Sequence, residues 1–294
     1  MISGILNINK EVGISSSKCV SLVKKALDTR KVGHTGTLDL EAGGVLPIVI
    51  GKATRVSDFL MDEDKEYITE AIFGKRTDTL DYDGEVVDTS DKTFTREDLE
   101  EAIKDFTGEI TQIPPMYSAL KVNGQKLYDL ARKGIEVERK KRQVNIYSFE
   151  IIDFDFPKAT FKITCSKGTY IRTLIDDLGE KLGSFAYVNS LTRSKVGDFY
   201  IEDAIDSKDL LDMNLEEVLE KLEPVDYALK SYPDIALDKS YLKQATNGMT
   251  MHVDQMDLDN LFRVYVEDDF IGLGRAHKSN DKYFLKMEKV FYEK

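Results

Sequence analysis

Residues 31–50 of the chain read KVGHTGTLDLEAGGVLPIVI, and no other stretch of the sequence is as distinctive. Four glycines and several small polar residues occupy its first part, residues 31–44. Because glycine accepts positive φ angles and lets the backbone approach a ligand closely, this part predicts a shaped binding loop. The short β-branched run at residues 45–50 lies between Gly44 and Gly51 and predicts a buried strand behind the loop.

Asp39 is the residue of this loop that can do chemistry. The glycines match neither a P-loop, which needs Gly-Lys-Ser/Thr at a set spacing, nor the dinucleotide-binding signature. His34 has no second histidine nearby, which argues against a zinc site, so no metal is expected. Asp39 remains as the ionisable group able to act as a nucleophile or acid–base catalyst. An aspartate here is also typical of a structural turn, and the loop alone leaves both interpretations open.

The sequence around the loop mixes helical and strand patterns. Serines at residues 15–17 can cap a helix, and Thr95-x-x-Asp98 is a capping box that opens another. Alternating apolar residues predict strands at residues 65–73, which include Tyr67, and at residues 161–165. A helical period starts at residue 169 and places on one face Ile171, Leu174, Ile175, Leu178 and Leu182.

Arg172 lies outside that apolar stripe, in the first turn of the predicted helix and directly after a strand. One interpretation is a surface arginine paired with Asp176 at the i+4 position. The other is a guanidinium that contacts an anion at a strand-to-helix junction. The pattern alone does not separate the two.

The last third of the chain changes character. Ten acidic and two basic residues occupy positions 202–226, and the interspersed leucines predict an amphipathic acidic helical segment that ends at Pro224. Beyond residue 232 the pattern is of short strands with glycine turns. We therefore expect a boundary near residues 225–233, with one domain over residues 1–228 and a small, mostly β domain over residues 229–294.

Composition excludes several classes of protein. The 294 residues are 41% hydrophobic, which is enough for a sizeable core and excludes a wholly disordered chain. Two cysteines, Cys19 and Cys165, are too few for a disulfide scaffold and predict a reducing compartment. The N-terminus lacks the pattern of a signal peptide, and no apolar run approaches the ~18 residues of a membrane span. A soluble, cytoplasmic protein without membrane contact is expected.

The net charge of −12 argues at first against a nucleic-acid partner. However, the charge is segregated along the chain. Residues 10–55 and 121–172 carry net charges of +4 and +6, while residues 56–120 and 173–294 carry −12 and −10. The basic residues Arg132-Lys133 and Arg139-Lys140-Lys141-Arg142 lie in the second basic block and would face phosphates, or form an ordinary solvated surface.

Several motifs, in order along residues 1–200, resemble those of the TruB family of tRNA pseudouridine-55 synthases. The catalytic-loop match is Gly33-His34-Thr35-Gly36-Thr37-Leu38-Asp39, and the others are Asp64-Lys65-x-Tyr67, Gly74-x-Arg76-Thr77-Asp78-Thr79, Gln112-Ile113-Pro114-Pro115-Met116-Tyr117-Ser118 and Cys165-Ser166-Lys167-Gly168-Thr169-Tyr170-Ile171-Arg172-Thr173. The chain departs from the family where proline usually stands, with Leu40 after the aspartate and Glu11 after Lys10. Neither departure replaces a reacting group.

The resemblance implies a role for each site residue. Asp39 would be the catalytic carboxylate, Arg172 would pair with it, and Tyr67 would stack on the target uracil. His34, Tyr170 and Leu191 would line the uridine or T-loop site. Leu191 rests on a shorter match, Ser190-Leu191-Thr192-Arg193.

The resemblance also implies the fold and the partners. It implies an α+β class, with a mixed, largely antiparallel sheet and flanking helices, followed by a small, mostly β PUA-like RNA-binding domain. Uridine would be isomerised to pseudouridine at position 55 in the tRNA T-loop, with tRNA (T-arm) as partner, no cofactor and no protein partner, by a monomer. Two alternatives stay open: a guide-RNA-dependent catalytic subunit, and a tRNA-binding or folding protein without activity.

Overall fold

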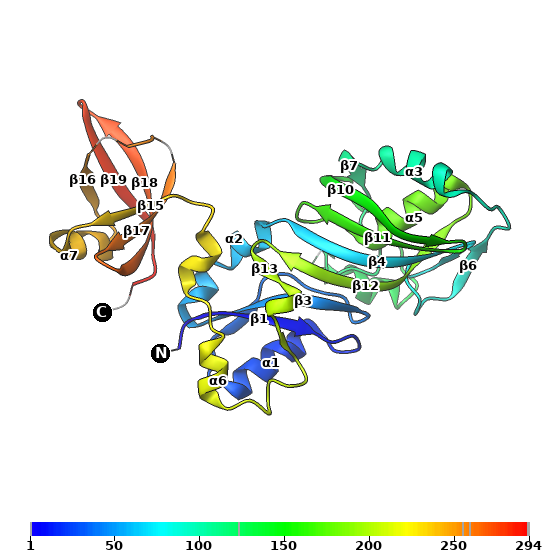
Figure 1. The fold of residues 1–294 in the computed structure, drawn as a ribbon, viewed down its shortest axis with the longest axis horizontal. Helices are drawn as coiled ribbons and strands as arrows, with labels where there is room; N and C mark the ends of the chain where they lie inside the picture. The colour runs from blue at the N-terminus through cyan, green and yellow to red at the C-terminus, as the bar shows by residue number, and fades with distance from the viewer. Residues whose placement is uncertain (1, 123, 255, 259, 293–294) are drawn as a thin grey trace.

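The computed structural model describes residues 2–122, 124–254, 256–258 and 260–292, and its strands form two main sheets (Figure 1). The larger sheet has the order β14-β1-β3-β12-β4-β11-β10-β7, with β2 paired to β3 and β13 to β12. Its strands are β1 Gly4–Lys10, β2 Val32–His34, β3 Ala42–Ile50, β4 Lys65–Phe73, β7 Gly108–Gln112, β10 Arg142–Asp155, β11 Lys158–Cys165, β12 Ala186–Val196, β13 Phe199–Tyr200 and β14 Ile205–Asp206.

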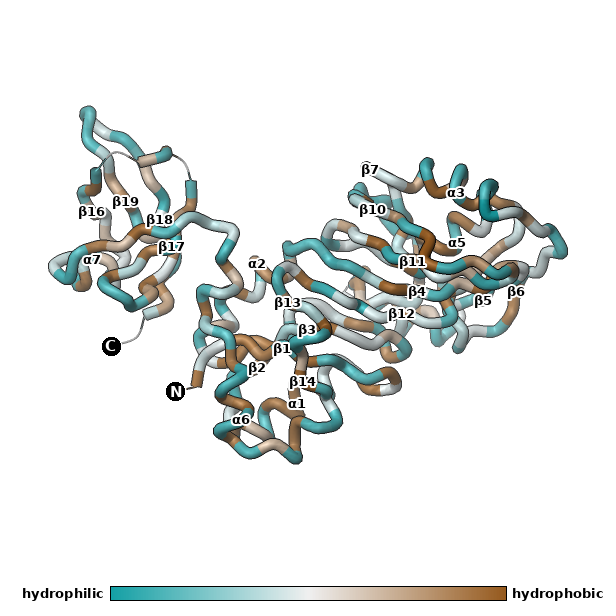
Figure 2. The backbone as a smooth tube through the Cα atoms, in the orientation of Figure 1, coloured by the Kyte–Doolittle hydropathy of each residue, from teal (hydrophilic) through white to brown (hydrophobic). Residues whose placement is uncertain are grey.

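Most neighbours in this sheet are antiparallel, and two pairs, β1 with β14 and β3 with β12, are parallel. Figure 2 shows hydrophobic stretches of chain at β1 and its neighbours, and β3 is buried along its whole length. In β4 every second residue is buried, from Lys65 through Tyr67 to Phe73. The expected α+β class with a mixed, largely antiparallel sheet is confirmed.

Two groups of helices pack on the large sheet. Helix α1 (Ser16–Ala26) packs on β1 and β3, while α3 (Arg96–Lys104) and α5 (Ile171–Leu182) pack together over the other half. Ser15 caps α1, and the Thr95 and Asp98 capping box opens α3, as predicted. The shorter elements are α2 Ser57–Asp62, α4 Leu127–Ala131, α6 Leu215–Glu220, β5 Lys75–Thr77, β6 Val86–Thr89, β8 Lys121–Val122, β9 Gln125–Lys126, η1 Gly51–Arg55, η2 Ile201–Asp203 and η3 Val225–Leu229.

The predicted acidic helical segment at residues 202–226 is largely wrong. The α-helix there is limited to α6, with the 3-10 turns η2 and η3 at the two ends of the segment, because residue 205 begins β14, which pairs in parallel with β1 through Ile8 and Ile205. Asn214 then caps α6 with a full capping box. A long-range strand pairing has therefore overridden a local amphipathic pattern.

The second sheet contains β15 Asp234–Leu237, β16 Thr250–Val253, β17 Leu261–Val266, β18 Asp269–Ser279 and β19 Lys282–Val290, in the order β15-β17-β18-β19-β16. Two short helical turns, η4 Lys239–Tyr241 and α7 Leu242–Thr246, accompany it. Leu273 and Phe291 of this part share a core with Leu60 and Leu229. No helix in the described part of the chain is long and apolar enough to cross a membrane.

Asp177 offers a pH test of how α5 packs on the large sheet. Desolvation, followed by the charges of Asp176 and Glu180, raises the pKa of Asp177 from 3.8 to about 6. The folded state therefore holds this proton more tightly than the unfolded chain, so stability falls as pH rises from about 4 to about 6. We expect Asp177→Asn to raise the free energy of unfolding at pH 7.5 by roughly 1–2 kcal/mol, after allowance for partial exposure.

The measurement is denaturant unfolding of both proteins at two pH values. The gain from Asp177→Asn should be roughly half as large at pH 5 as at pH 7.5. Asp153→Asn, at an exposed carboxylate of β10, is the matched control and should change stability little. A gain that does not depend on pH would contradict the assignment.

Candidate active site

Asp39 lies in the loop between β2 and β3, and the core holds this loop from both sides. The backbone N–H and C=O of Leu38 both bond to the buried Ser16 hydroxyl on α1. Gly44 has a φ of 102°, and a Cβ there would lie 2.2 Å from the carbonyl oxygen of Arg193. The glycine is required at this position because β3 and β12 approach each other so closely.

Lys10 holds the loop through hydrogen bonds to backbone carbonyl oxygens. Its side chain is fully buried, and its ammonium donates to the carbonyl oxygens of Ile14 at 2.7 Å, Glu11 at 2.9 Å and Leu40 at 3.3 Å. Burial lowers its pKa from the usual lysine value. The side chain of Leu40 is exposed. Its carbonyl oxygen accepts hydrogen bonds from Lys10 and from the amide of Gly13, and these bonds fix the backbone where the family usually has a proline ring.

Arg172 is the centre of the charged network around Asp39. Its Nη2 lies 2.7 Å from Asp39 Oδ2, and its Nη1 lies 3.3 Å from Asp81 Oδ2. The same guanidinium donates to the carbonyl oxygens of Thr79 at 2.9 Å and Tyr117 at 2.7 Å. The Arg172 side chain is 6% exposed, whereas that of Asp39 is 42% exposed. The guanidinium is thus fixed inside the protein, and it holds the carboxylate of Asp39 on the side that faces solvent.

The surface interpretation of Arg172 is wrong. Asp176 instead forms an ion pair with Arg76 of β5, at 2.6 Å. Arg172 is buried although it lies off the apolar stripe of α5, because the loops that carry Thr79 and Tyr117 cover it. Sequence reasoning also missed Asp81, which follows the matched motif at residues 74–79; the only available signal was its place between that motif and Gly84.

A pocket opens beside Asp39. It is lined by Asp39, Glu41, Ala42, Asp81, Tyr82, Arg172, Val188, Asn189, Ser190 and Leu191, and its volume is about 10 Å³. Leu191 pairs with Ala42 across the parallel β12–β3 contact and packs against the cores of both halves of the sheet. The structure therefore brings Asp39, Arg172 and Leu191 to one pocket, at the junction of the two halves.

Tyr67 lies on β4 and is buried. Desolvation raises the pKa of its phenol, and the charge of Arg193 acts in the opposite direction. Arg193 is itself 2% exposed and donates from Nε to the carbonyl oxygen of Val45 at 2.8 Å. The structure does not place Tyr67 on the lining of the pocket, although the charge of Asp39 acts on its phenol.

Tyr170 and His34 also lie outside the pocket lining. Tyr170 precedes α5, and desolvation raises the pKa of its phenol. Arg142 lies 5.5 Å from the centre of the Tyr170 ring. Desolvation and the charge of Arg193 lower the pKa of His34, which keeps its imidazole neutral near pH 7. Among the described residues, Nδ1 of His34 has no hydrogen-bond partner.

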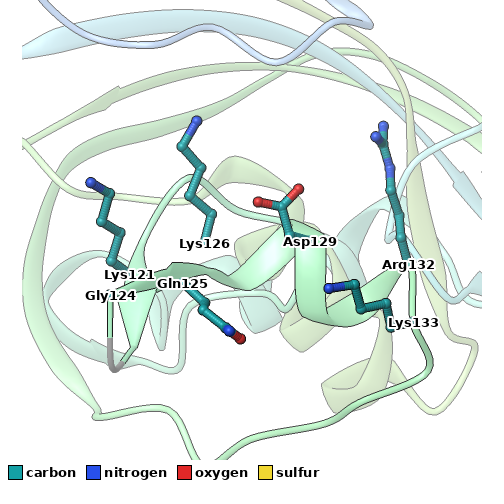
Figure 3. A pocket seen from close by; sticks show the side chains of 7 residues that line it. All are labelled: Lys121, Gly124, Gln125, Lys126, Asp129, Arg132 and Lys133. Atoms are coloured by element: carbon teal, nitrogen blue, oxygen red, sulfur yellow. The ribbon is translucent and has the colours of Figure 1, made fainter.

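The basic residues of the second block gather around α4. Lys121, Lys126, Arg132 and Lys133 line one hollow with Asp129, and Figure 3 shows Lys126, Asp129 and Arg132 pointing to the same side of the helix. The structure places the second basic run differently. Arg139 is ion-paired with Glu136 and half-buried, and Arg142 lies against Tyr170. Lys140 and Lys141 are exposed.

The placement of the side chains gives little support for thiol or metal chemistry. Cys19 and Cys165 are both free and buried. Burial raises the pKa of the Cys165 thiol to about 12, so it stays protonated. Within the described residues, no group of three His, Cys, Asp or Glu side chains is placed to hold a metal ion.

Comparison with known proteins identifies the family. Residues 24–171 match the model of the TruB family pseudouridylate synthase (N terminal domain), and residues 172–230 match that of the tRNA pseudouridylate synthase B C-terminal domain. A protein of Clostridium kluyveri named tRNA pseudouridine synthase B is 44% identical, over 99% of this chain and 100% of that protein. A Clostridium tetani protein of the same name is also 44% identical, over 96% of this chain and 98% of its own length.

Solved structures agree on the fold. The Cbf5-Nop10-Gar1 complex contains a chain with a TM-score of 0.75 and 26% identity, covering 98% of this chain and 85% of its own. An H/ACA RNP bound to a substrate RNA containing 2′-deoxyuridine also gives a TM-score of 0.75, at 24% identity, covering 99% of this chain and 85% of its own. The resemblance seen in the motifs is confirmed, and this chain belongs to the TruB family of pseudouridylate synthases.

Proposed function

We propose that this protein isomerises uridine to pseudouridine at position 55 in the T-loop of tRNA, with Asp39 as the catalytic carboxylate. The observation that carries the proposal is the ion pair between Asp39 and the buried Arg172 at the edge of a pocket. The name shared by the relatives that are 44% identical over nearly the whole chain supports tRNA as the substrate.

The reaction needs a carboxylate that is both exposed and fixed. The bond between N1 of uracil and C1′ of ribose breaks, the ring turns, and a bond forms between C5 and C1′. The hydrogen at C5 leaves to solvent and N1 gains one, so atoms and electrons balance without an oxidant, reductant or group donor. Arg172 holds Oδ2 of Asp39, which leaves Oδ1 to form the covalent bond, either to the sugar or to the base.

Base flipping sets the energetic requirement. A uridine in a folded RNA loop must leave its stack, which costs a few kcal/mol. Stacking of the uracil on an aromatic ring such as Tyr67 returns roughly 1–3 kcal/mol. Arg193 of β12 pairs with Tyr67 of β4 in the sheet and would help to fix the position of this ring. His34, Tyr170 and Leu191 would complete the site, with Tyr170 supported by Arg142.

We assign RNA contact to the hollow at α4, and domain roles follow the expected division at residues 228 and 229. The larger part carries the catalytic site, and the smaller sheet would add a PUA-like RNA-binding module. The protein would act as a monomer, without a guide RNA or protein partner. The relatives that carry the name tRNA pseudouridine synthase B are 44% identical to this chain, whereas the chain from the Cbf5 complex is 26% identical. The difference in identity favours the stand-alone enzyme over the guide-dependent subunit.

The direct test incubates the purified protein with an unmodified tRNA transcript and no other macromolecule. Carbodiimide labelling and primer extension then locate pseudouridine. We expect a single stop, at position 55, which is lost when that uridine is replaced by cytidine. A guide-dependent subunit would give no stop until a guide RNA and partner proteins are added, and modification elsewhere would contradict the assigned position.

The basic hollow predicts the salt dependence of tRNA binding. Each ammonium or guanidinium that neutralises a phosphate releases a counterion, so affinity should fall with added salt. We expect the double variant Lys126→Ala/Arg132→Ala to flatten the slope of log K against log salt by roughly 2. The measurement is filter binding over a range of salt concentrations.

The matched control is Lys104→Ala/Lys181→Ala. These two ammonium groups are already ion-paired, with Glu101 and Asp105, so their loss should leave the slope nearly unchanged. Equal slopes for the hollow variant and the wild type would remove the hollow from the RNA-binding surface.

A further inference from the structure

Two side chains that line the pocket at Asp39 contact each other. Tyr82 lies in the turn between β5 and β6, and its hydroxyl donates a hydrogen bond to the carboxylate of Glu41, two residues after Asp39. Both side chains line the pocket together with Asp39 and Arg172. The bond to Glu41 also raises the pKa of the Tyr82 phenol to about 12, so the donor keeps its proton at neutral pH.

The size of the pocket shows that its lining must change to admit a uridine. A volume of about 10 Å³ is the room for one water molecule. A uracil ring is several times larger than a water molecule, so it cannot enter this pocket while the lining stays as it is. Some part of the lining has to move before the reaction begins.

The backbones on either side are poorly placed to move. On one side, Arg172 holds Asp81, and the amide of Val188 donates to the carbonyl oxygen of Leu80 at 3.1 Å. On the other side, the buried Lys10 bonds to the carbonyl oxygen of Leu40. Tyr82, by contrast, is 47% exposed, and rotation of its side chain needs no change in the core.

We propose that Tyr82 and Glu41 form a latch that keeps the catalytic pocket closed until a flipped uridine displaces the phenol. This inference rests on the proposed function, because it assigns the opening to the substrate RNA. The latch selects for RNA that makes enough contacts elsewhere on the protein to offset the broken hydrogen bond.

The first test is Tyr82→Phe, which keeps the ring and removes the donor. A closed latch opposes entry of the substrate, so we expect kcat/KM for a T-arm hairpin to rise about threefold to tenfold, the effect of one hydrogen bond. Tyr147→Phe is the matched control and should leave kcat/KM unchanged. Tyr147 is 49% exposed, and desolvation and then the nearby Asp64 raise the pKa of its phenol, outside the pocket. An unchanged or lower kcat/KM for Tyr82→Phe overturns the latch.

The second test observes the opening itself. The chain has no tryptophan, so Tyr82→Trp places a single fluorescent indole in the lining of the pocket. In an Asp39→Asn background, which stops turnover, tRNA should shift the emission of this indole, while Tyr147→Trp should show no shift. Emission that tRNA leaves unchanged overturns the latch. Failure of the proposed function is distinct, because the wild type would then form no pseudouridine.

Discussion

Asp39→Asn should lower the single-turnover rate of pseudouridine formation at least about a thousandfold while leaving tRNA affinity within a factor of about three. The amide has nearly the same shape as the carboxylate, but it cannot form the covalent bond that the reaction needs. Its oxygen can still accept from Arg172, so the network that holds the loop stays in place. The split between rate and affinity separates a chemical role from a structural one.

The rate is measured by rapid quench at saturating enzyme, and the affinity by filter binding. Asp83→Asn is the matched control, since Asp83 is an exposed carboxylate in the nearby turn and lies outside the pocket lining. It should retain the wild-type rate. If Asp39→Asn retained more than about a tenth of the rate, the carboxylate would not be the reacting group.

Arg172→Met should produce the second large effect, on both rate and stability. Its loss leaves the carboxylate of Asp81, whose side chain is 13% exposed, without its cation, and removal of one partner of a buried pair costs roughly 3–5 kcal/mol. It also releases Asp39, so the rate should fall at least about a hundredfold. Arg172→Lys should remain impaired, because a single ammonium cannot make four directed contacts.

A double variant distinguishes the two effects of Arg172. Asp81→Asn removes the carboxylate that Arg172→Met leaves unpaired, so the double variant should recover part of the lost free energy of unfolding. It should recover none of the lost rate, because Asp39 is still without its guanidinium. Denaturant unfolding and rapid quench give the two quantities. Recovery of the rate, or strictly additive stability losses, would contradict the network.

Local signals were enough for much of the fold. The Ser15 cap, the Thr95 and Asp98 capping box and the alternation in β4 all depend on residues a few positions apart, and all appear as predicted. The acidic segment failed because its fate depends on Ile8, almost two hundred residues away, to which Ile205 pairs. Amphipathic spacing cannot report such a partner.

The same contrast between local signals and contacts distant in sequence applies to the site. Asp39 could be named as a candidate from its own loop, although the loop alone left a structural turn open. The burial of Arg172 could not, since the groups that cover it, Thr79 and Tyr117, lie far away in the sequence. The contact between Tyr82 and Glu41 likewise joins two loops that no motif connects. Charge counted by segment revealed the basic excess of residues 121–172, which the net charge concealed and which contains the hollow at α4.

Tritium release tests the central claim most directly. The substrate is tRNA that carries tritium at C5 of uridine, incubated without cofactor with the purified wild type or with Asp39→Asn. Isomerisation moves the glycosidic bond to C5 and so releases the label from position 55. We predict stoichiometric release by the wild type and almost none by the variant. Equal release from both would remove Asp39 from its role, and no release from either would show a protein that binds tRNA without isomerising it.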